Sequence, residues 1–162
     1  MKDWVNDFSL IQVRDVNGDA YPDVIFSKDD DYPCDEKRAV WLNDTHGGWN
    51  AHLGCGGTWE MPIFLKDEDN YYPDYGTRAF DYNGDLITDL VWAYAAAEDG
   101  RNQIDQWEVW KGTGTTTGWT EVTTVEVPNS FVFADNGHAD SGVQITDVNN
   151  DGLQDIVYSW ED

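Results

Sequence analysis

The chain carries few positive charges. Its 162 residues include 9 lysines and arginines but 32 aspartates and glutamates, which gives a formal net charge of −23 at pH 7. A surface of this sign repels nucleic acid phosphates and anionic lipid headgroups, so neither is expected as a partner. Such a surface attracts metal cations instead.

Long apolar runs are missing as well. No segment approaches the roughly 20 consecutive apolar residues of a membrane-spanning helix, so membrane insertion is not expected. The first residues, MKDWVNDFSL, contain no apolar signal-peptide core.

Cysteine is scarce. Cys34 and Cys55 lie 21 positions apart, which excludes a CxxC metal pair. They form either one disulfide, in an oxidising compartment, or two free thiols. Asn43 opens the sequon Asn-Asp-Thr, an N-glycosylation acceptor if a eukaryote secretes the protein.

Recognisable catalytic motifs are also lacking. The 3 histidines are scattered, and the chain contains neither an HExxH motif nor a GxSxG elbow. Carboxylates are so frequent that their spacing singles out no acid–base pair. We therefore expect a protein that is not an enzyme.

What the chain does have is enough apolar and aromatic material for a core. Hydrophobic residues make up 40%, with 9 Trp, 8 Tyr and 6 Phe. At this length one domain of ordinary size is expected, and the aromatic content argues against disorder despite the charge.

Three acidic segments recur at equal spacing. They read DVNGDAYPDVIF, DYNGDLITDLVW and DVNNDGLQDIVY, and they begin at Asp15, Asp81 and Asp147, 66 residues apart in each case. Each has the form D-x-N-x-D-x-x-x-D followed by two apolar residues and an aromatic one. Equal spacing of three such motifs indicates an internal repeat.

Tryptophan-bearing segments recur between the acidic ones. VWLNDTHGGW contains Trp41 and Trp49, and VWKGTGTTTGW contains Trp110 and Trp119; both patterns predict a strand, a Gly-rich turn and a strand. We expect these rings to pack between neighbouring units. β-Branched and aromatic enrichment with little helical periodicity predicts an all-β fold, with four antiparallel strands in each unit.

Each acidic loop offers the hard oxygen ligands that calcium prefers. Calcium takes six to eight oxygens, which side chains at loop positions 1, 3, 5 and 9 and a carbonyl at position 7 can supply. The alternative is a solvated turn, because Asp, Asn and Gly are common turn residues. The predicted ligands for up to three ions are Asp15, Asn17, Asp19, Tyr21 (carbonyl) and Asp23; Asp81, Asn83, Asp85, Ile87 (carbonyl) and Asp89; and Asp147, Asn149, Asp151, Leu153 (carbonyl) and Asp155.

Position 6 distinguishes the three loops. A sharp backbone turn there favours Gly, and only the third loop has one, Gly152. The first loop has Ala20 and the second Leu86. If φ is positive at this position, Leu86 should be the most strained.

The acidic segments followed by VWLN…GGW resemble the FG-GAP/VCBS family of calcium-loop β-propeller repeats over nearly the whole chain. The resemblance implies blades of four antiparallel strands with the calcium loop between the first two strands. It gives about two and a half blades, a partial propeller or open array: residues 4–65, 76–133 and 142–162. Open sheet edges would then require copies of the chain or further blades as partners.

The resemblance implies a calcium-binding, non-enzymatic recognition or structural module that is extracellular or at the cell surface. Adhesion, carbohydrate or protein binding, or a place in a larger assembly would fit it. Trp59 and Trp107 are candidates for stacking on sugars. The alternative is an accessory propeller of a secreted hydrolase or toxin whose catalytic part lies elsewhere.

Overall fold

The computed structural model describes residues 11–27, 38–53, 59–63, 65, 76–94, 106–114, 118–125 and 142–158. All regular secondary structure in these residues is β-strand, which confirms the all-β prediction. Among them there is no helix that is long and apolar enough to cross a membrane.

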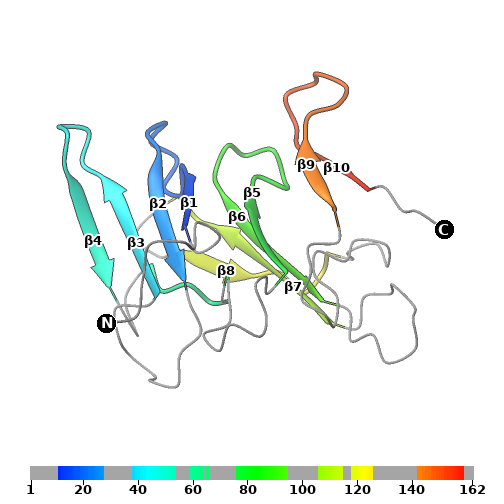
Figure 1. Ribbon diagram of the computed structural model, residues 1–162, viewed down its shortest axis with the longest axis horizontal. Coiled ribbons are helices and arrows are strands. Elements are labelled where there is room, and N and C mark those ends of the chain that lie inside the picture. The colour runs from blue at the N-terminus through cyan, green and yellow to red at the C-terminus, as the bar shows by residue number, and fades with distance from the viewer. Residues whose placement is uncertain are drawn as a thin grey trace.

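The described strands form three antiparallel sheets that lie side by side (Figure 1). In the two four-stranded sheets the strands follow chain order, as the sequence predicted. A closed propeller is not seen in the described part of the chain. The sheets are β1 (Ile11–Arg14), β2 (Asp23–Ser27), β3 (Arg38–Asn43) and β4 (Trp49–Leu53); β5 (Thr77–Phe80), β6 (Asp89–Tyr94), β7 (Gln106–Gly112) and β8 (Trp119–Glu121); and β9 (Gln144–Thr146) with β10 (Asp155–Val157).

The Gly-rich segment after β7 is a hairpin turn, as predicted. The N–H of Thr113 donates to the carbonyl of Gly118 at 2.9 Å, and Gly112 pairs with Trp119 across the hairpin. In the first sheet Asn43 pairs with Trp49 in the corresponding place. The tryptophans of the two hairpins therefore occupy matching register positions.

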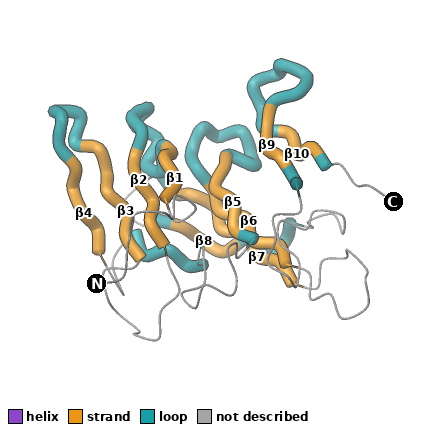
Figure 2. Tube along the Cα trace, viewed as in Figure 1, coloured by secondary structure: helices purple, strands orange, loops and turns teal. Residues whose placement is uncertain are grey.

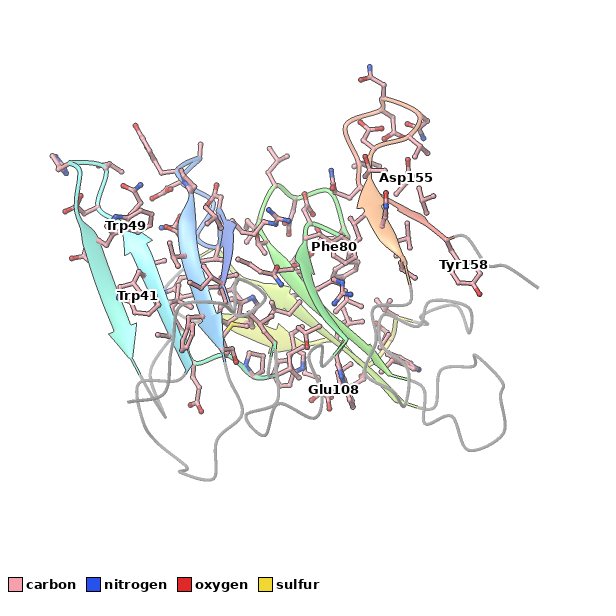
Figure 3. The ribbon with its side chains drawn as sticks, in the orientation of Figure 1. Trp41, Trp49, Phe80, Glu108, Asp155 and Tyr158 are labelled. Carbon is pink, nitrogen blue, oxygen red and sulfur yellow. The ribbon has the colours of Figure 1, made fainter. Side chains whose placement is uncertain are left out.

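The matching tryptophans differ in burial, however. Trp119 is 9% exposed and belongs to the core, whereas Trp49 is 47% exposed on β4 (Figure 3). The expectation that both rings pack between neighbouring sheets is wrong for Trp49. Within the described residues, β4 is the outer strand of its sheet and no sheet follows it, so this ring meets no second layer.

The main core lies between the first two sheets and includes the segment that connects them. Trp59, Met61, Ile63 and Leu65 are all buried there, at every second position. Alternation of this kind is typical of an extended chain with one buried face. The ring of Trp59 is 3% exposed and packs edge-to-face on Trp119 at 5.5 Å, so it has no free face for a sugar, and we assign it to the core.

A second apolar cluster joins the second sheet to the third. Phe80 and Val91 pack there with Val143, the residue just before β9. Trp107 and Tyr158 are partly buried against the same cluster. The third sheet is thereby attached to the second through side-chain packing.

Two hydrogen bonds also connect the first two sheets directly. The Nε–H of Arg14 donates to the carbonyl of Ala79 at 3.0 Å, and the N–H of Thr88 donates to the carbonyl of Asp15 at 3.1 Å. The three acidic loops all lie at the same end of their sheets (Figure 2).

Candidate metal centres

The three acidic loops share one hydrogen-bond pattern, centred on the aspartate at position 1. In the first loop, Asp15 accepts the N–H of Gly18 at 2.7 Å and that of Ala20 at 2.8 Å. Asp81 and Asp147 accept the N–H groups at the same loop positions. Each loop is thus folded around the carboxylate of its first residue.

Backbone dihedrals repeat as well. The residues at positions 4 and 6 have positive φ in every loop, including 69° at Ala20, 68° at Leu86 and 88° at Gly152. This left-handed region costs non-glycine residues roughly 1–2 kcal/mol. Because φ is positive, the strain expected at Leu86 is present, and Ala20 is strained as well.

The aspartate at position 9 ties each loop to its sheet. Asp23 accepts the N–H of Val16 at 3.0 Å and that of Asn43, at the end of β3, at 2.8 Å. Asp89 accepts the corresponding N–H groups of Tyr82 and Gly112, at 3.1 and 2.7 Å. Both carboxylates are completely buried. They hold the loop and the third strand together through these hydrogen bonds.

Asp155, at position 9 of the third loop, follows this pattern only in part. It accepts the N–H of Val148 at 3.0 Å, which repeats the bond to the loop, but it is half-buried at the start of β10 (Figure 3). No third strand pairs with β10 in the described residues. The third loop is therefore the most accessible of the three.

Burial changes the acidity of these carboxyl groups. Removal from water raises the pKa of Asp89 to about 6, although N–H donors from Gly112 and Tyr82 act against this. Burial also raises the pKa of Asp23 above its usual value. Burial therefore disfavours the charged form of both carboxylates.

The asparagine at position 3 of each loop donates a side-chain N–H to one of the carboxylates. The side-chain amide of Asn17 donates to Asp19 at 3.0 Å, and Asn149 donates to Asp151 at the same distance. In the second loop the amide of Asn83 donates instead to Asp89, at 2.8 Å. These donors partly offset the negative charge of the loops.

The second loop also has a cation from another strand. The Nζ of Lys111, at the end of β7, lies 2.8 Å from Oδ2 of Asp85. Burial opposes the charge of Asp85, but the hydrogen bond and charge of Lys111 outweigh it and lower the pKa of that carboxyl. Lys111 lies outside the acidic-loop motif, so the sequence pattern gave no sign of this contact.

Among the described residues no three carboxylate, imidazole or thiol groups lie close enough together to hold a metal ion. The aspartates accept backbone amides instead of meeting at one point. Side-chain oxygens at positions 1, 3, 5 and 9 are nevertheless the ligand type that calcium selects, and none is a nitrogen or sulfur ligand that zinc would need. Calcium binding at the three loops remains a prediction.

The other candidate residues are spread over the molecule. Asn43 lies at the end of β3, where its Nδ2 donates to the carbonyl of Pro22 at 3.4 Å and its Oδ1 accepts the N–H of Thr45 at 2.8 Å. Trp107 is half-buried on β7. Cys34 and Cys55 lie outside the described residues. Sugar stacking at Trp107, the glycan at Asn43 and the disulfide therefore stay predictions.

Comparison with protein-family models, curated proteins and solved structures finds no match to this chain. The likeness to FG-GAP/VCBS repeats consequently depends on the residues of the acidic loops and tryptophan hairpins alone.

Proposed function

We propose that this protein is a calcium-binding, non-enzymatic recognition or structural module that works outside the cell or at its surface. Further blades or other copies of the chain would complete it, in the manner of FG-GAP/VCBS propellers. The observation that carries the proposal is the common fold of the three acidic loops.

Identical backbone geometry supports a common role for these loops. Solvated turns of unrelated purpose would have no reason to repeat both left-handed positions and the amide bonds to the first aspartate. At position 6 two of the loops accept a strained non-glycine residue, Ala20 or Leu86. Backbone strain is retained where the surrounding structure requires that conformation.

The donor set fits calcium in chemistry. Three carboxylates and one amide oxygen are available in each loop, in addition to a backbone carbonyl. A bound divalent cation would neutralise carboxylates that otherwise repel one another. The buried aspartates Asp23 and Asp89 would gain most, because their charged forms are the least favoured without a cation.

The loop end of the molecule also presents apolar side chains to solvent. Tyr21, Leu86 and Leu153 project there with 48%, 78% and 51% of their surfaces exposed. Apolar groups beside acidic loops are suited to contact a partner molecule, and calcium would hold them in fixed positions. Extracellular calcium, at roughly millimolar concentration, would fill sites whose Kd is ~10⁻⁴–10⁻³ M.

Isothermal titration calorimetry of the metal-depleted protein with calcium tests the proposal. We expect two or three bound ions per chain, weaker heats with magnesium, and a higher melting temperature in calcium than in EDTA. The variant Asp151→Asn should lose one ion. Its matched control, Glu121→Gln, removes the same charge from an exposed position outside the loops and should lose none.

Fewer than two bound ions, or equal melting temperatures in calcium and EDTA, would count against calcium as the ligand. Light scattering at several protein concentrations tests the assembly separately. A compact monomer at micromolar concentration would exclude self-association as the way in which the sheet edges are covered.

A further inference from the structure

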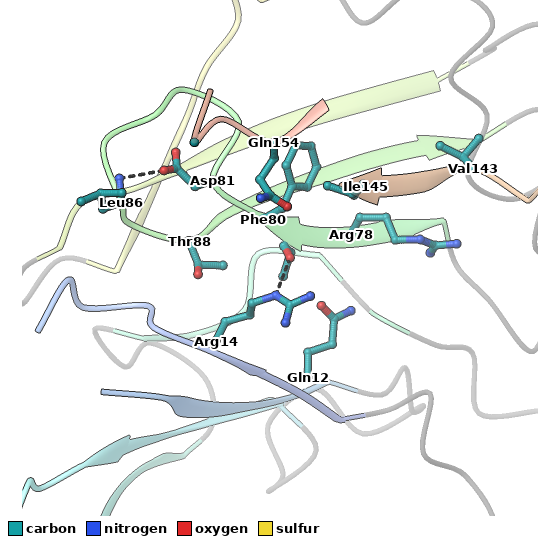
Figure 4. A pocket seen from close by; sticks show the side chains of 12 residues that line it. Gln12, Arg14, Arg78, Phe80, Asp81, Leu86, Thr88, Val143, Ile145 and Gln154 are labelled. Carbon is teal, nitrogen blue, oxygen red and sulfur yellow. Dashed lines mark hydrogen bonds between the residues drawn. The ribbon is translucent and has the colours of Figure 1, made fainter. Parts of the chain in front are cut away.

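A hollow of about 590 Å³ lies where the first strands of the three sheets face one another. Residues of β1, β5 and β9 line it, together with parts of the second and third acidic loops (Figure 4). Its volume is within the range of small-molecule sites, which is about 300–1,000 Å³. Of the residues with a predicted functional role, the calcium-ligand candidate Asp81 alone lines this space.

Basic side chains are unusually frequent in the lining of the hollow. Arg14 and Arg78 line it, although the whole chain has only 9 lysines and arginines. A single carboxylate among the lining residues, Asp81, is already bonded to the N–H groups of Gly84 and Leu86. In a chain with net charge −23, two guanidinium groups thus line the hollow beside one carboxylate.

Arg14 is held in a defined orientation. Its Nε donates to the carbonyl of Ala79 at 3.0 Å and its Nη1 to the carbonyl of Val13 at 3.0 Å. Within the described residues no carboxylate pairs with it, so its charge is not neutralised by an ion pair. A guanidinium fixed by two backbone carbonyls is prepared to donate its remaining N–H groups to a carboxylate.

Neutral polar groups and apolar surface complete the lining. Gln12 projects from β1 beside Arg14, and Gln154 enters from the third loop (Figure 4). Amides of this kind both donate to and accept from hydroxyl groups. Val143 and Ile145 supply apolar surface on the β9 side. An inorganic ion gains nothing from contact with apolar surface, whereas the carbon skeleton of an organic ligand packs favourably against it.

We propose that this hollow binds a small hydroxylated organic carboxylate, with the carboxylate against Arg14 and Gln12. Arg78 lies farther along β5, where its Nη1 donates to the carbonyl of Thr77 at 3.1 Å (Figure 4). The hydroxyl groups bond to the glutamines, and the carbon skeleton lies against Val143 and Ile145. These contacts involve no calcium ion, so the proposal does not require calcium binding, although Asp81 and Gln154 of the lining belong to the acidic loops.

Calorimetric titration with D-glucuronate tests this, on full-length protein freed of metal by a chelating resin because EDTA is itself a carboxylate. We expect saturable binding of D-glucuronate and none of D-glucose, its neutral counterpart. Arg14→Gln should weaken binding at least about tenfold, since a charge-assisted hydrogen bond is lost. Arg14→Lys keeps the charge but not the planar fork and should also weaken binding, which separates local contact from long-range attraction.

Because Arg14 also bonds to the second sheet, its variants could be destabilised. Gln12→Leu changes the same place without removing a bond between sheets, and it should weaken D-glucuronate binding by several-fold. Sulfate should compete, since it presents oxygens to the same guanidinium. Absence of D-glucuronate binding, equal binding of D-glucose, tighter binding of sulfate, or unchanged affinity in both Gln12→Leu and Arg14→Lys would overturn the proposal.

Discussion

Lys111 at the end of β7 lies 2.8 Å from Asp85 in the second acidic loop, and it links a carboxylate of the loop to the third strand of the same sheet. No lysine or arginine of the described residues is paired with an aspartate of the first or third loop. The ammonium group supplies part of the positive charge that a metal ion would bring.

Replacing Lys111 by Met should therefore tighten calcium binding at the second loop, because the ion no longer competes with an ammonium group for Asp85. Calorimetry should resolve one site whose affinity rises and others that do not change. Lys111→Arg is the control, since it keeps the charge and should leave affinity near that of the wild type. A uniform change at all sites would indicate a general charge effect instead.

Two substitutions at position 6 of the loops should change the stability of the fold in opposite directions. Gly152→Ala places a β-carbon at φ 88° and should destabilise the fold by about 1 kcal/mol, whereas Leu86→Gly removes one at φ 68°. Leu86 is 78% exposed, so little burial is lost, but the freer unfolded chain of a glycine variant reduces the gain. Urea denaturation measures both. Destabilisation of the Leu86→Gly variant by more than about 1 kcal/mol, the entropic cost of a glycine, would show that strain is absent there.

Gly112 is a position where no side chain fits. A β-carbon there would collide with the backbone carbonyl of Thr88 and lie 2.7 Å from Ile87. Gly112→Ala should cost about 1–3 kcal/mol of stability, because it also displaces the N–H that Asp89 accepts.

The matched control for that variant is Gly142→Ala. Its new β-carbon meets no atom within 4 Å, so only the positive φ of 76° opposes it. Thermal denaturation should show a larger loss of stability for Gly112→Ala. Equal losses would mean that the close approach of β7 to the second loop does not matter.

Asp89 makes the stability of the metal-free protein depend on pH. Its folded-state pKa of about 6 lies above its ordinary value of 3.8, so the folded state binds the proton more tightly. The resulting stabilisation is present below pH 3.8 and is lost as pH rises through 6.

Denaturant titrations of the resin-treated protein between pH 4 and pH 7 check this expectation. Asp89→Asn cannot ionise and should lack the pH-dependent stabilisation. The difference in stability between variant and wild type should therefore change between pH 4 and pH 7. Bound calcium should suppress the same stabilisation, because a cation favours the charged carboxylate. A constant difference would place the ionisation elsewhere.

Local patterns predicted the strands and hairpins, because alternation and turn residues act between near neighbours. Asp89 illustrates what they could not predict. Its spacing in the loop suggested only a metal ligand, but its structural role depends on Gly112, 23 residues away on another strand. Trp59 was a candidate for stacking on sugars, yet alternation of Trp59, Met61 and Ile63 would have indicated a buried extended chain.

The hollow could not be found from sequence for a similar reason. Arg14 corresponds to Phe80 in the second sheet, since both pair with the position 9 aspartate of their own loop. Nothing in the repeat pattern marks one of these residues as polar. Only the arrangement of the three sheets brings Arg14 and Arg78 to a common space.

The paired contacts between the first two sheets have a mechanical consequence. Arg14 binds the carbonyl of Ala79 while Thr88 binds that of Asp15, so each sheet donates one hydrogen bond to the other across the same seam. The shared core closes this seam from the side of Trp59. Separating the two sheets would break both hydrogen bonds and expose the shared core. The two sheets should therefore unfold together in one cooperative transition.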